Sequence, residues 1–175
     1  MRIIHTLICT TALLAASGCT AIPGDRPGSA AAPPPAAETL EIAVGPCFGF
    51  CPVYRASIDP AGKVHFEGER HTALLGARDT QIAPGHGAAV IASLASYRPA
   101  TGTTAQTQCE QQISDQQHYT LSWTAPDGTR TMLEHDKGCR SPRNEALNAL
   151  IGALPEQIGI GAWAKQTTRP GVSRG

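Results

Sequence analysis

Two stretches of the chain repeat one order of patterns: an alternating apolar run, a turn, a second alternating run and a helical stretch. Residues 53–58 and 63–67 alternate on either side of Asp59-Pro60-Ala61-Gly62, and residues 119–124 and 129–135 alternate on either side of Pro126-Asp127-Gly128. Pro, Asp and Gly in short connections are typical of hairpin turns. Because alternation gives each strand one apolar face, the pattern predicts an antiparallel sheet with one buried, apolar face and one solvent-exposed, polar (wet) face.

Each hairpin is followed by apolar residues at helical spacing. These residues are Val90, Ile91, Leu94 and Tyr97 in the first helix, and Leu147, Leu150, Ile151 and Leu154 in the second. Ser141 and Pro142 fit the N-cap and first position of the second helix. Further strands are expected at 40–44 and 74–82, and the Thr- and Gln-rich stretch 101–117 is expected to be a long crossover loop. The sequence therefore predicts an α+β domain, an antiparallel sheet built from two hairpins, each followed by a helix packed on one face.

The first residues of the chain have the order of a secretory signal. Arg2 precedes the apolar run 6–16, and small residues then lead to Cys19. This ending resembles the bacterial lipobox, whose cysteine is lipidated and becomes the first residue, although Ala16 stands where the lipobox prefers Leu. The alternative is a soluble secreted protein in which Cys19 is a coincidence. In such lipoproteins an Asp after the cysteine marks inner-membrane retention, so Thr20 favours the periplasmic face of the outer membrane.

Composition divides the rest of the chain. We expect a signal peptide at 1–18, a lipidated cysteine and Pro/Ala-rich spacer at 19–39, one domain at 40–164 and a disordered tail at 165–175. An extended spacer of this length reaches at most about 60 Å from a bilayer. The formal net charge of zero argues against a nucleic-acid binder and a polybasic membrane binder, and no run of about 20 apolar residues predicts a spanning helix.

Four cysteines remain once Cys9 is removed with the signal and Cys19 is lipidated. In an oxidising compartment, Cys47, Cys51, Cys109 and Cys139 are expected to form two disulfides, with three pairings open. Cys109 precedes one strand of the second hairpin and Cys139 follows the other, so both lie at its open end, within bonding reach. We therefore expect Cys109 to pair with Cys139 and Cys47 with Cys51.

The small ring closed by Cys47 and Cys51 contains Phe48, Gly49 and Phe50. One interpretation is that the ring caps the sheet and that one or both Phe side chains plug the core. A second is a binding loop that exposes an aromatic side chain. A third is a redox-active dithiol, although known oxidoreductases place two residues between their cysteines in a thioredoxin-like setting.

Residues 45–54 (GPCFGFCPVY) and 62–68 (GKVHFEG) resemble the bacterial domain of unknown function family numbered 6438. Its members open with G-x-C-x-G-x-C-P-x-Y and continue with a hairpin that ends in Tyr/Phe-Glu-Gly. The resemblance covers Leu40 to Leu154, and Cys109 and Cys139 are extra relative to many members. The family carries no established activity, so the resemblance implies a fold and an envelope location without a mechanism.

Motifs for catalysis or metal binding are not found in the sequence. The cysteine and histidine spacings do not fit a zinc site, and no nucleophile elbow, phosphate loop or dinucleotide fingerprint occurs, so no catalytic residue, metal or other cofactor is expected. His65 alternates with Val64 and Phe66 and is expected on the wet face. His135, near Cys139 at a strand end, is expected in a solvated turn.

These features predict an envelope lipoprotein, held to the membrane by its lipid, with a non-catalytic domain that binds an envelope protein or a cell-wall component. The alternative is a thiol–disulfide redox protein that uses Cys47 and Cys51. An enzyme whose site is assembled from distant residues is a third hypothesis.

Overall fold

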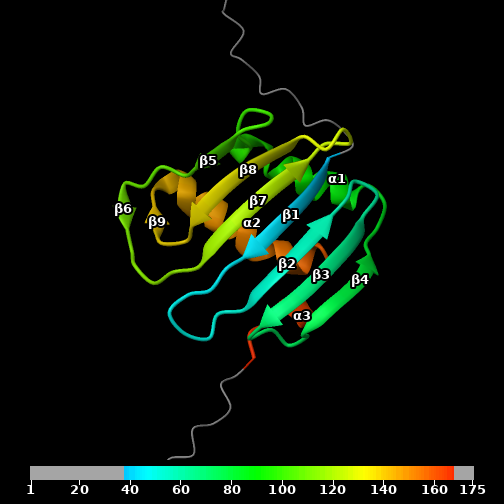
Figure 1. Ribbon diagram of the computed structural model, residues 1–175, viewed down its shortest axis with the longest axis horizontal. Coiled ribbons are helices and arrows are strands. Elements are labelled where there is room, and N and C mark those ends of the chain that lie inside the picture. The colour runs from blue at the N-terminus through cyan, green and yellow to red at the C-terminus, as the bar shows by residue number, and fades with distance from the viewer. Residues whose placement is uncertain (1–37, 168–175) are drawn as a thin grey trace, which may run out of the picture. The chain divides into compact units, whose positions relative to one another are not determined.

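A seven-stranded sheet runs through residues 38–167, the part of the chain that the computed structural model describes (Figure 1). The strands of this sheet are β1 (Thr39–Val44), β2 (Val53–Ile58), β3 (Lys63–Arg70), β4 (Gly76–Gln81), β5 (Thr104–Gln106), β7 (His118–Thr124) and β8 (Arg130–Asp136). Two short strands, β6 (Gln111–Gln112) and β9 (Cys139–Arg140), form a separate pair. The expected signal peptide, Cys19 and most of the spacer and tail lie outside the described residues.

The order of strands is β4-β3-β2-β1-β7-β8-β5, and every neighbouring pair is antiparallel except β5 with β8. Both predicted hairpins are confirmed, as β2 with β3 and as β7 with β8. The expectation of a loop throughout 101–117 is wrong, because β5 pairs in parallel with β8 and β6 pairs with β9. A three-residue edge strand with only Ala105 half-buried leaves no apolar alternation to detect.

Three helices cover one face of the sheet: α1 (His86–Ser93), α2 (Pro142–Gln157) and α3 (Gly161–Ala164), with a short 3₁₀ turn, η1 (Ala95–Tyr97), after α1 (Figure 1). The covered face holds the core, in which Phe66, Leu121 and Trp123 are fully buried. The other face is polar. The α+β prediction is therefore confirmed, with both expected helical stripes against the sheet.

The start of α2 follows the expected capping chemistry. Ser141 is extended, and its hydroxyl accepts a hydrogen bond from the Asn144 amide at 3.1 Å. Pro142 occupies the first turn, where its missing N–H costs no helical hydrogen bond.

The register of the sheet separates two sets of loops. Val44 of β1 lies beside Tyr54 and Tyr119, so the connections 45–52, 71–75, 113–117 and 137–138 share one end of the sheet, which we call the Phe48 end. Thr39 lies beside Thr124, so the turns 59–62 and 125–129 share the opposite end, which we call the Glu38 end. The chain enters the described domain at the Glu38 end.

Glu38 and Thr39, which composition assigns to the spacer, belong to this folded unit. Glu38 is 1% exposed, and its carboxylate forms two hydrogen bonds with the Arg98 guanidinium, at 2.6 and 3.2 Å. Arg98 also donates to the hydroxyls of Thr101 and Thr131. At the other terminus, Gln166 pairs with Thr72, and the Thr167 amide donates to the His71 carbonyl.

Candidate functional site

The connection from β1 to β2 projects beyond the core at the Phe48 end. A disulfide joins Cys47 to Cys51 across it, as expected, with the Cα atoms 5.7 Å apart. Phe48 is 88% exposed, so the interpretation that it plugs the core is wrong. The physical reason is that the strands end at Val44 and Val53, and Tyr54 and Tyr119 already close the core there. Gly49, at φ 138°, adopts a conformation that other residues rarely reach.

The loop closed by the Cys47–Cys51 disulfide contacts a neighbouring loop on each side. The Phe50 ring is half-buried and meets His71 of the β3–β4 turn edge to face, with centroids 5.2 Å apart. The Phe48 amide donates to the carbonyl of Asp115 at 3.2 Å. Within residues 38–167, His71 and Asp115 are the only non-glycine residues with positive φ. Such conformations cluster at functional sites, so this placement marks the Phe48 end as a candidate site.

A buried glutamine ties the base of the loop together. The Gln117 amide nitrogen donates to the carbonyls of Gly45 and Pro52, at 3.2 and 2.9 Å, and thus bridges the two ends of the loop. The Tyr119 hydroxyl donates to the Gln117 carbonyl oxygen at 3.3 Å. Burial raises the pKa of Tyr119, so its hydroxyl keeps the proton that this bond requires. Sequence reasoning missed Gln117, because a single Gln in a Gln-rich stretch carries no periodic signal.

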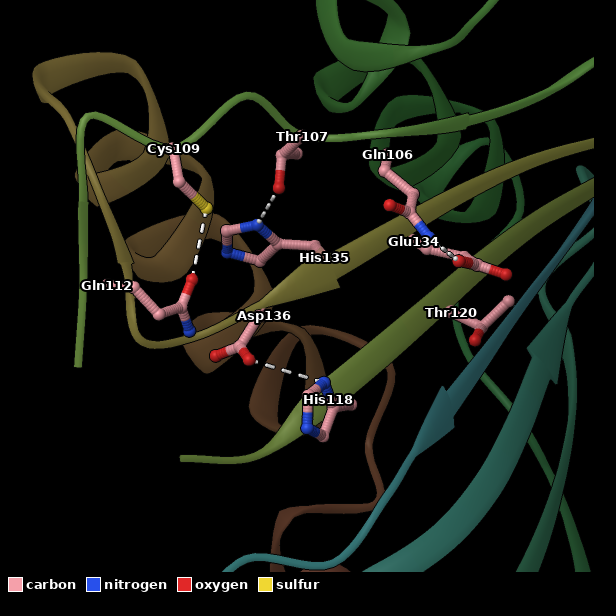
Figure 2. Close-up of a pocket in the computed structure, with 9 residues that line it drawn as sticks. All are labelled: Gln106, Thr107, Cys109, Gln112, His118, Thr120, Glu134, His135 and Asp136. Carbon is pink, nitrogen blue, oxygen red and sulfur yellow. Dashed lines mark hydrogen bonds and ion pairs between the residues drawn. The ribbon is translucent and has the colours of Figure 1, made fainter. Parts of the chain in front are cut away.

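A cavity lined mostly by residues with polar side chains lies beside the second hairpin at the same end of the sheet (Figure 2). Its volume is about 340 Å³, and it is lined by Gln106, Thr107, Cys109, Gln112, His118, Thr120, Glu134, His135 and Asp136. Two hydrogen-bonded or ionic pairs already occupy its carboxylates: Glu134 accepts from Gln106 at 2.7 Å, and Asp136 lies 3.4 Å from His118. Both carboxylates of the cavity therefore already have a side-chain partner.

His135 is buried at 2% exposure, so its expected place in a solvated turn is wrong. It continues the alternation of Thr131 and Leu133 on the covered face of β8. Its Nδ1 lies 2.9 Å from the Thr107 hydroxyl and its Nε2 lies 2.9 Å from the Asn148 side-chain oxygen. Burial lowers the pKa of His135, and the hydrogen bond to Asn148 and the charge of Asp136 oppose that shift.

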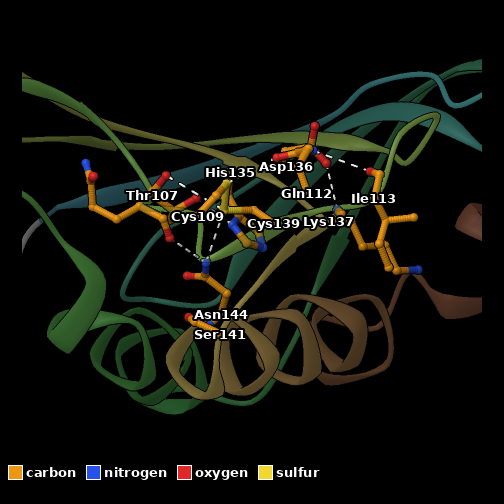
Figure 3. Close-up of a disulfide and its surroundings, with 12 residues drawn as sticks. Thr107, Cys109, Gln112, Ile113, His135, Asp136, Lys137, Cys139, Ser141 and Asn144 are labelled. Atoms are coloured by element: carbon orange, nitrogen blue, oxygen red, sulfur yellow. Dashed lines mark hydrogen bonds between the residues drawn. A yellow bond between two sulfur atoms is a disulfide. The ribbon is translucent and has the colours of Figure 1, made fainter.

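The second expected disulfide joins Cys109 to Cys139, whose Cα atoms lie 4.9 Å apart (Figure 3). It attaches the β5–β6 segment to β9, and Cys139 is fully buried. The Asn144 side-chain amide, in the first turn of α2, donates to the Gln108 carbonyl at 2.8 Å and contacts the Cys139 sulfur at 3.2 Å. The Cys109–Cys139 disulfide therefore stabilises the packing of the β5–β6 segment and β9 against the start of α2. The Cys47–Cys51 disulfide instead closes a projecting loop.

The remaining expectations concern metals and the polar face. Among residues 38–167, no group of three or more His, Cys, Asp or Glu side chains is arranged to hold a metal ion. His65 lies on the open face, as expected, 2.7 Å from Asp79 of β4. No helix in the described part of the chain is long and apolar enough to cross a membrane.

Comparison with known proteins gives one match. The family model described as "Domain of unknown function (DUF6438)" matches residues 38–157, which include the Phe48 loop, both disulfides and all of α2. No curated protein and no solved structure matches the chain.

Proposed function

Because the chain belongs to the family of the domain of unknown function DUF6438, which supplies a fold and no activity, we propose a function from its geometry. The chain is a lipid-anchored protein of the bacterial envelope, attached through Cys19 to the outer membrane and facing the periplasm. Its domain is a non-catalytic binding module that contacts another envelope component through the Phe48 end.

One observation carries this proposal: Phe48, 88% exposed, sits on a loop closed by a disulfide and tied at its base by Gln117. When a partner covers an aromatic side chain that is exposed to water, the free energy of the complex is lowered, because apolar surface is removed from water. The loop is also held in shape before contact, so little conformational entropy is lost on binding. Together, exposure and rigidity are what a recognition element requires.

Photo-crosslinking tests the binding role. Replacing Phe48 by the photo-reactive amino acid benzoylphenylalanine, in the full chain in envelopes, is expected to give discrete adducts with protein, glycan or lipid. The control is the same replacement at Ala61, an exposed position in the β2–β3 turn at the Glu38 end. Adducts at position 61 equal to those at position 48, or none at either, would contradict the proposal.

Intact-protein mass spectrometry tests the anchor. The proposal expects a mature chain that begins at Cys19 and carries a diacylglyceryl group and an additional acyl chain. A chain that begins at Cys19 without lipid, or at another residue, would contradict the anchor and leave the Phe48 surface to be tested by crosslinking alone.

The rival proposal, thiol–disulfide exchange by Cys47 and Cys51, is favoured by the partial exposure of both cysteines. If Cys47 and Cys51 have a redox role, we expect their disulfide to have a reduction potential well above that of structural disulfides and to exchange rapidly with small thiols. A non-reducing peptide map after mild thiol treatment decides between the two: an intact Cys47–Cys51 peptide supports the binding module, and mixed disulfides support the redox role.

A further inference from the structure

Another cavity lies at the Phe48 end, between the sheet and the helices that cover it. Its volume is about 200 Å³, and it is lined from the sheet by Tyr54 and Tyr119 and from α2 by Ile151 and Gly152. Gln117, which ties the base of the connection 45–52, lines it as well. An engineered cavity of about 150 Å³ binds benzene, so this space is large enough for a ligand somewhat larger than benzene.

The Tyr54 hydroxyl has no hydrogen-bond partner in the part of the chain that the structure describes. Tyr54 is only 6% exposed, and the neighbouring Tyr119 hydroxyl donates to Gln117 instead. Among residues 38–167, the only side-chain nitrogen or oxygen that lacks a partner and is also closed off from solvent is Nε1 of Trp123. The Tyr54 hydroxyl therefore still reaches solvent at the cavity that Tyr54 lines. Because buried polar groups are nearly always hydrogen-bonded, it marks a place for a water molecule or a ligand atom.

This hydroxyl acts as a hydrogen-bond donor at neutral pH. Burial raises the pKa of Tyr54, and the neighbouring Tyr119 raises it further, so the proton stays on the oxygen. A hydroxyl donates best to an ionised acceptor, because hydrogen bonds to charged groups are about twice as strong as neutral ones. A ligand carboxylate is the acceptor that this donor favours.

Two side chains of opposite charge line the same cavity. Glu156 belongs to the last turn of α2, and Lys165 directly follows α3. Both are exposed, and no ion pair within residues 38–167 includes either of them. The Glu156 carboxylate lies against Gly161, since a Cβ on that glycine would overlap it. The cavity thus offers one anionic and one cationic group at its exposed part, and the two charges cancel.

We propose that this cavity binds a small zwitterion, a free α-amino acid with an apolar side chain. The Lys165 ammonium and the Tyr54 hydroxyl bind its carboxylate, and the Glu156 carboxylate binds its ammonium group. Its side chain packs against Ile151 and Ala164. A ligand of a single charge fits less well, because Glu156 repels an anion and Lys165 repels a cation. A purely apolar ligand leaves the Tyr54 hydroxyl without a partner.

The inference goes beyond the proposed function, because the cavity lies behind the connection 45–52 and does not use Phe48. The two surfaces are nevertheless neighbours, since Pro52 and Gln117 line the cavity and are joined by a hydrogen bond at the base of that connection. Crosslinking from position 48 and binding of an amino acid are separate measurements, and either one can succeed without the other.

Amide chemical shifts test the site. The mature chain, with Cys19→Ser to remove the proposed acylation site, is isotope-labelled and titrated with leucine, as the L and the D enantiomer in turn. We expect at least one enantiomer to shift the backbone amides of Gly152, Gly161 and Lys165 and the side-chain amide of Gln117. The amides of the turns 59–62 and 125–129, at the Glu38 end, are expected to stay unchanged.

Two leucine derivatives test the recognition of both charges. N-acetyl-leucine has no ammonium group, and leucinamide has no carboxylate. Each is expected to bind about fivefold or more weakly than leucine, because one charged hydrogen-bonding contact is lost. Glu156→Gln and Lys165→Gln are expected to weaken the binding of leucine by a similar factor.

Gly152→Leu tests the location of the site without removing a contact. A Cβ at Gly152 meets no atom within 4 Å, and leucine has a higher helix propensity than glycine, so the domain is expected to stay folded. The new side chain is expected to occupy the cavity and to weaken binding by about tenfold or more. The matched control is Ala146→Leu, at an exposed position of α2 that does not line the cavity, and its affinity is expected to be unchanged.

Tyr54→Phe removes the hydroxyl alone. Because this hydroxyl has no partner in the described residues, we expect the melting temperature to stay the same while the affinity for leucine falls by about fivefold. Tyr119→Phe, which loses the hydrogen bond to Gln117, is expected to lower the melting temperature.

Each outcome supports or overturns a stated part of the inference. No amide shift with either enantiomer, or shifts of the same size at the Glu38 end, overturns the site. Equal binding of leucinamide or N-acetyl-leucine overturns the recognition of a zwitterion. Unchanged affinity in Gly152→Leu overturns the location, and unchanged affinity in Tyr54→Phe overturns the role of the hydroxyl. Crosslinks from position 48 without leucine binding overturn this inference and keep the binding module, and leucine binding without crosslinks does the reverse.

Discussion

The imidazole of His135 lies between two hydrogen-bonding side chains, Thr107 on the β5–β6 segment and Asn148 on α2. A neutral ring with its proton on Nε2 donates to the Asn148 oxygen and accepts from the Thr107 hydroxyl, so both nitrogens are satisfied. Protonation would place a charge in a buried site. The single residue thus connects the edge of the sheet to the helix that covers it.

This environment predicts a loss of stability in mild acid. Because burial lowers the pKa of His135 below the value of 6.5 that it has in the unfolded chain, the unfolded state binds the proton more readily. The contribution of neutral His135 to the stability of the domain is present above pH 6.5 and is lost as the pH falls through the folded-state pKa. His135→Gln is expected to be about 1 to 3 kcal/mol less stable at neutral pH and to lose this pH dependence. Urea unfolding of both proteins from pH 8 to about pH 5 measures the free energy of unfolding at each pH. The same dependence on pH in the two proteins would contradict the prediction.

Individual side chains were the hardest features to predict from sequence. Phe48, Gln117 and His135 lie in or beside loops, where their environment depends on which distant segments meet. His135 did carry a signal, since it keeps the alternation of β8, but its position near a turn concealed it. Gln117 carried none, because a hydrogen bond to Gly45 and Pro52 depends on contacts far apart in the chain.

Among the elements, β3 contains a close approach that explains a glycine of the family motif. A Cβ on Gly68 would lie 2.0 Å from the Leu74 carbonyl oxygen, so the β3–β4 turn could not fold back as it does. Gly68→Ala is expected to destabilise the domain by about 1 to 3 kcal/mol through this overlap. Thermal unfolding measures the effect.

Gly152 supplies the matched control for that substitution. It lies exposed in α2, and a Cβ there would meet no atom within 4 Å. Gly152→Ala is therefore expected to stabilise the domain by about 0.5 to 1 kcal/mol, through helix propensity alone. If the two variants changed the melting temperature alike, the role of the Gly68 contact would be contradicted.

The two disulfides are expected to differ in their effect on stability. Replacing Cys109 and Cys139 by Ala opens a loop that spans 30 positions and removes a buried side chain, so we expect a loss of about 4 kcal/mol or more. Replacing Cys47 and Cys51 by Ala opens a separation of four and is expected to cost about 2 kcal/mol or less. Urea unfolding of the two variants tests the order, which equal midpoint shifts would contradict.

Elements were predicted well where the hydrophobic period was long enough to detect. Both hairpins, the helical stripes and the Ser141 cap follow from residues a few positions apart. The strand β5 was missed because it depends on parallel pairing with β8, which is a long-range contact. Its three residues include only one half-buried side chain, so the sequence shows no alternating pattern there.

At the scale of the whole molecule, a bidentate ion pair secures the start of the domain. Glu38 and Arg98 are 60 residues apart, and both side chains are almost completely buried, at 1% and 12% exposure. A chain that begins at Leu40, the boundary expected from composition, would leave Arg98 buried without its partner.

Removing one member of this pair is expected to cost about 3 to 5 kcal/mol, because an uncompensated charge stays buried. Glu38→Ala tests this by denaturant unfolding. The double variant Glu38→Leu with Arg98→Met is the control, and it is expected to be more stable than Glu38→Ala alone. A double variant no more stable than Glu38→Ala would contradict the claim that the cost comes from an uncompensated buried charge.

Charge is a second property that changes with scale. The formal charge of zero belongs to the whole chain and does not say which charged side chains lie together. At the Phe48 end Glu69 pairs with Arg55, and Asp136 lies beside His118. Arg70, Lys137 and Lys165 have no carboxylate partner in the described domain. Only the folded arrangement shows which charges neutralise each other.

The place of β1 in the sheet also decides how the domain would carry tension. β1 follows directly after Glu38, lies between β2 and β7 and ends at the connection that holds Phe48. A pull between a tethered amino terminus and a bound Phe48 loop would therefore run along the axis of β1. Its hydrogen bonds to both neighbours stand across that axis, so they would share the load in shear instead of opening one after another. The strand that enters the fold first is thus placed to hold it together under force.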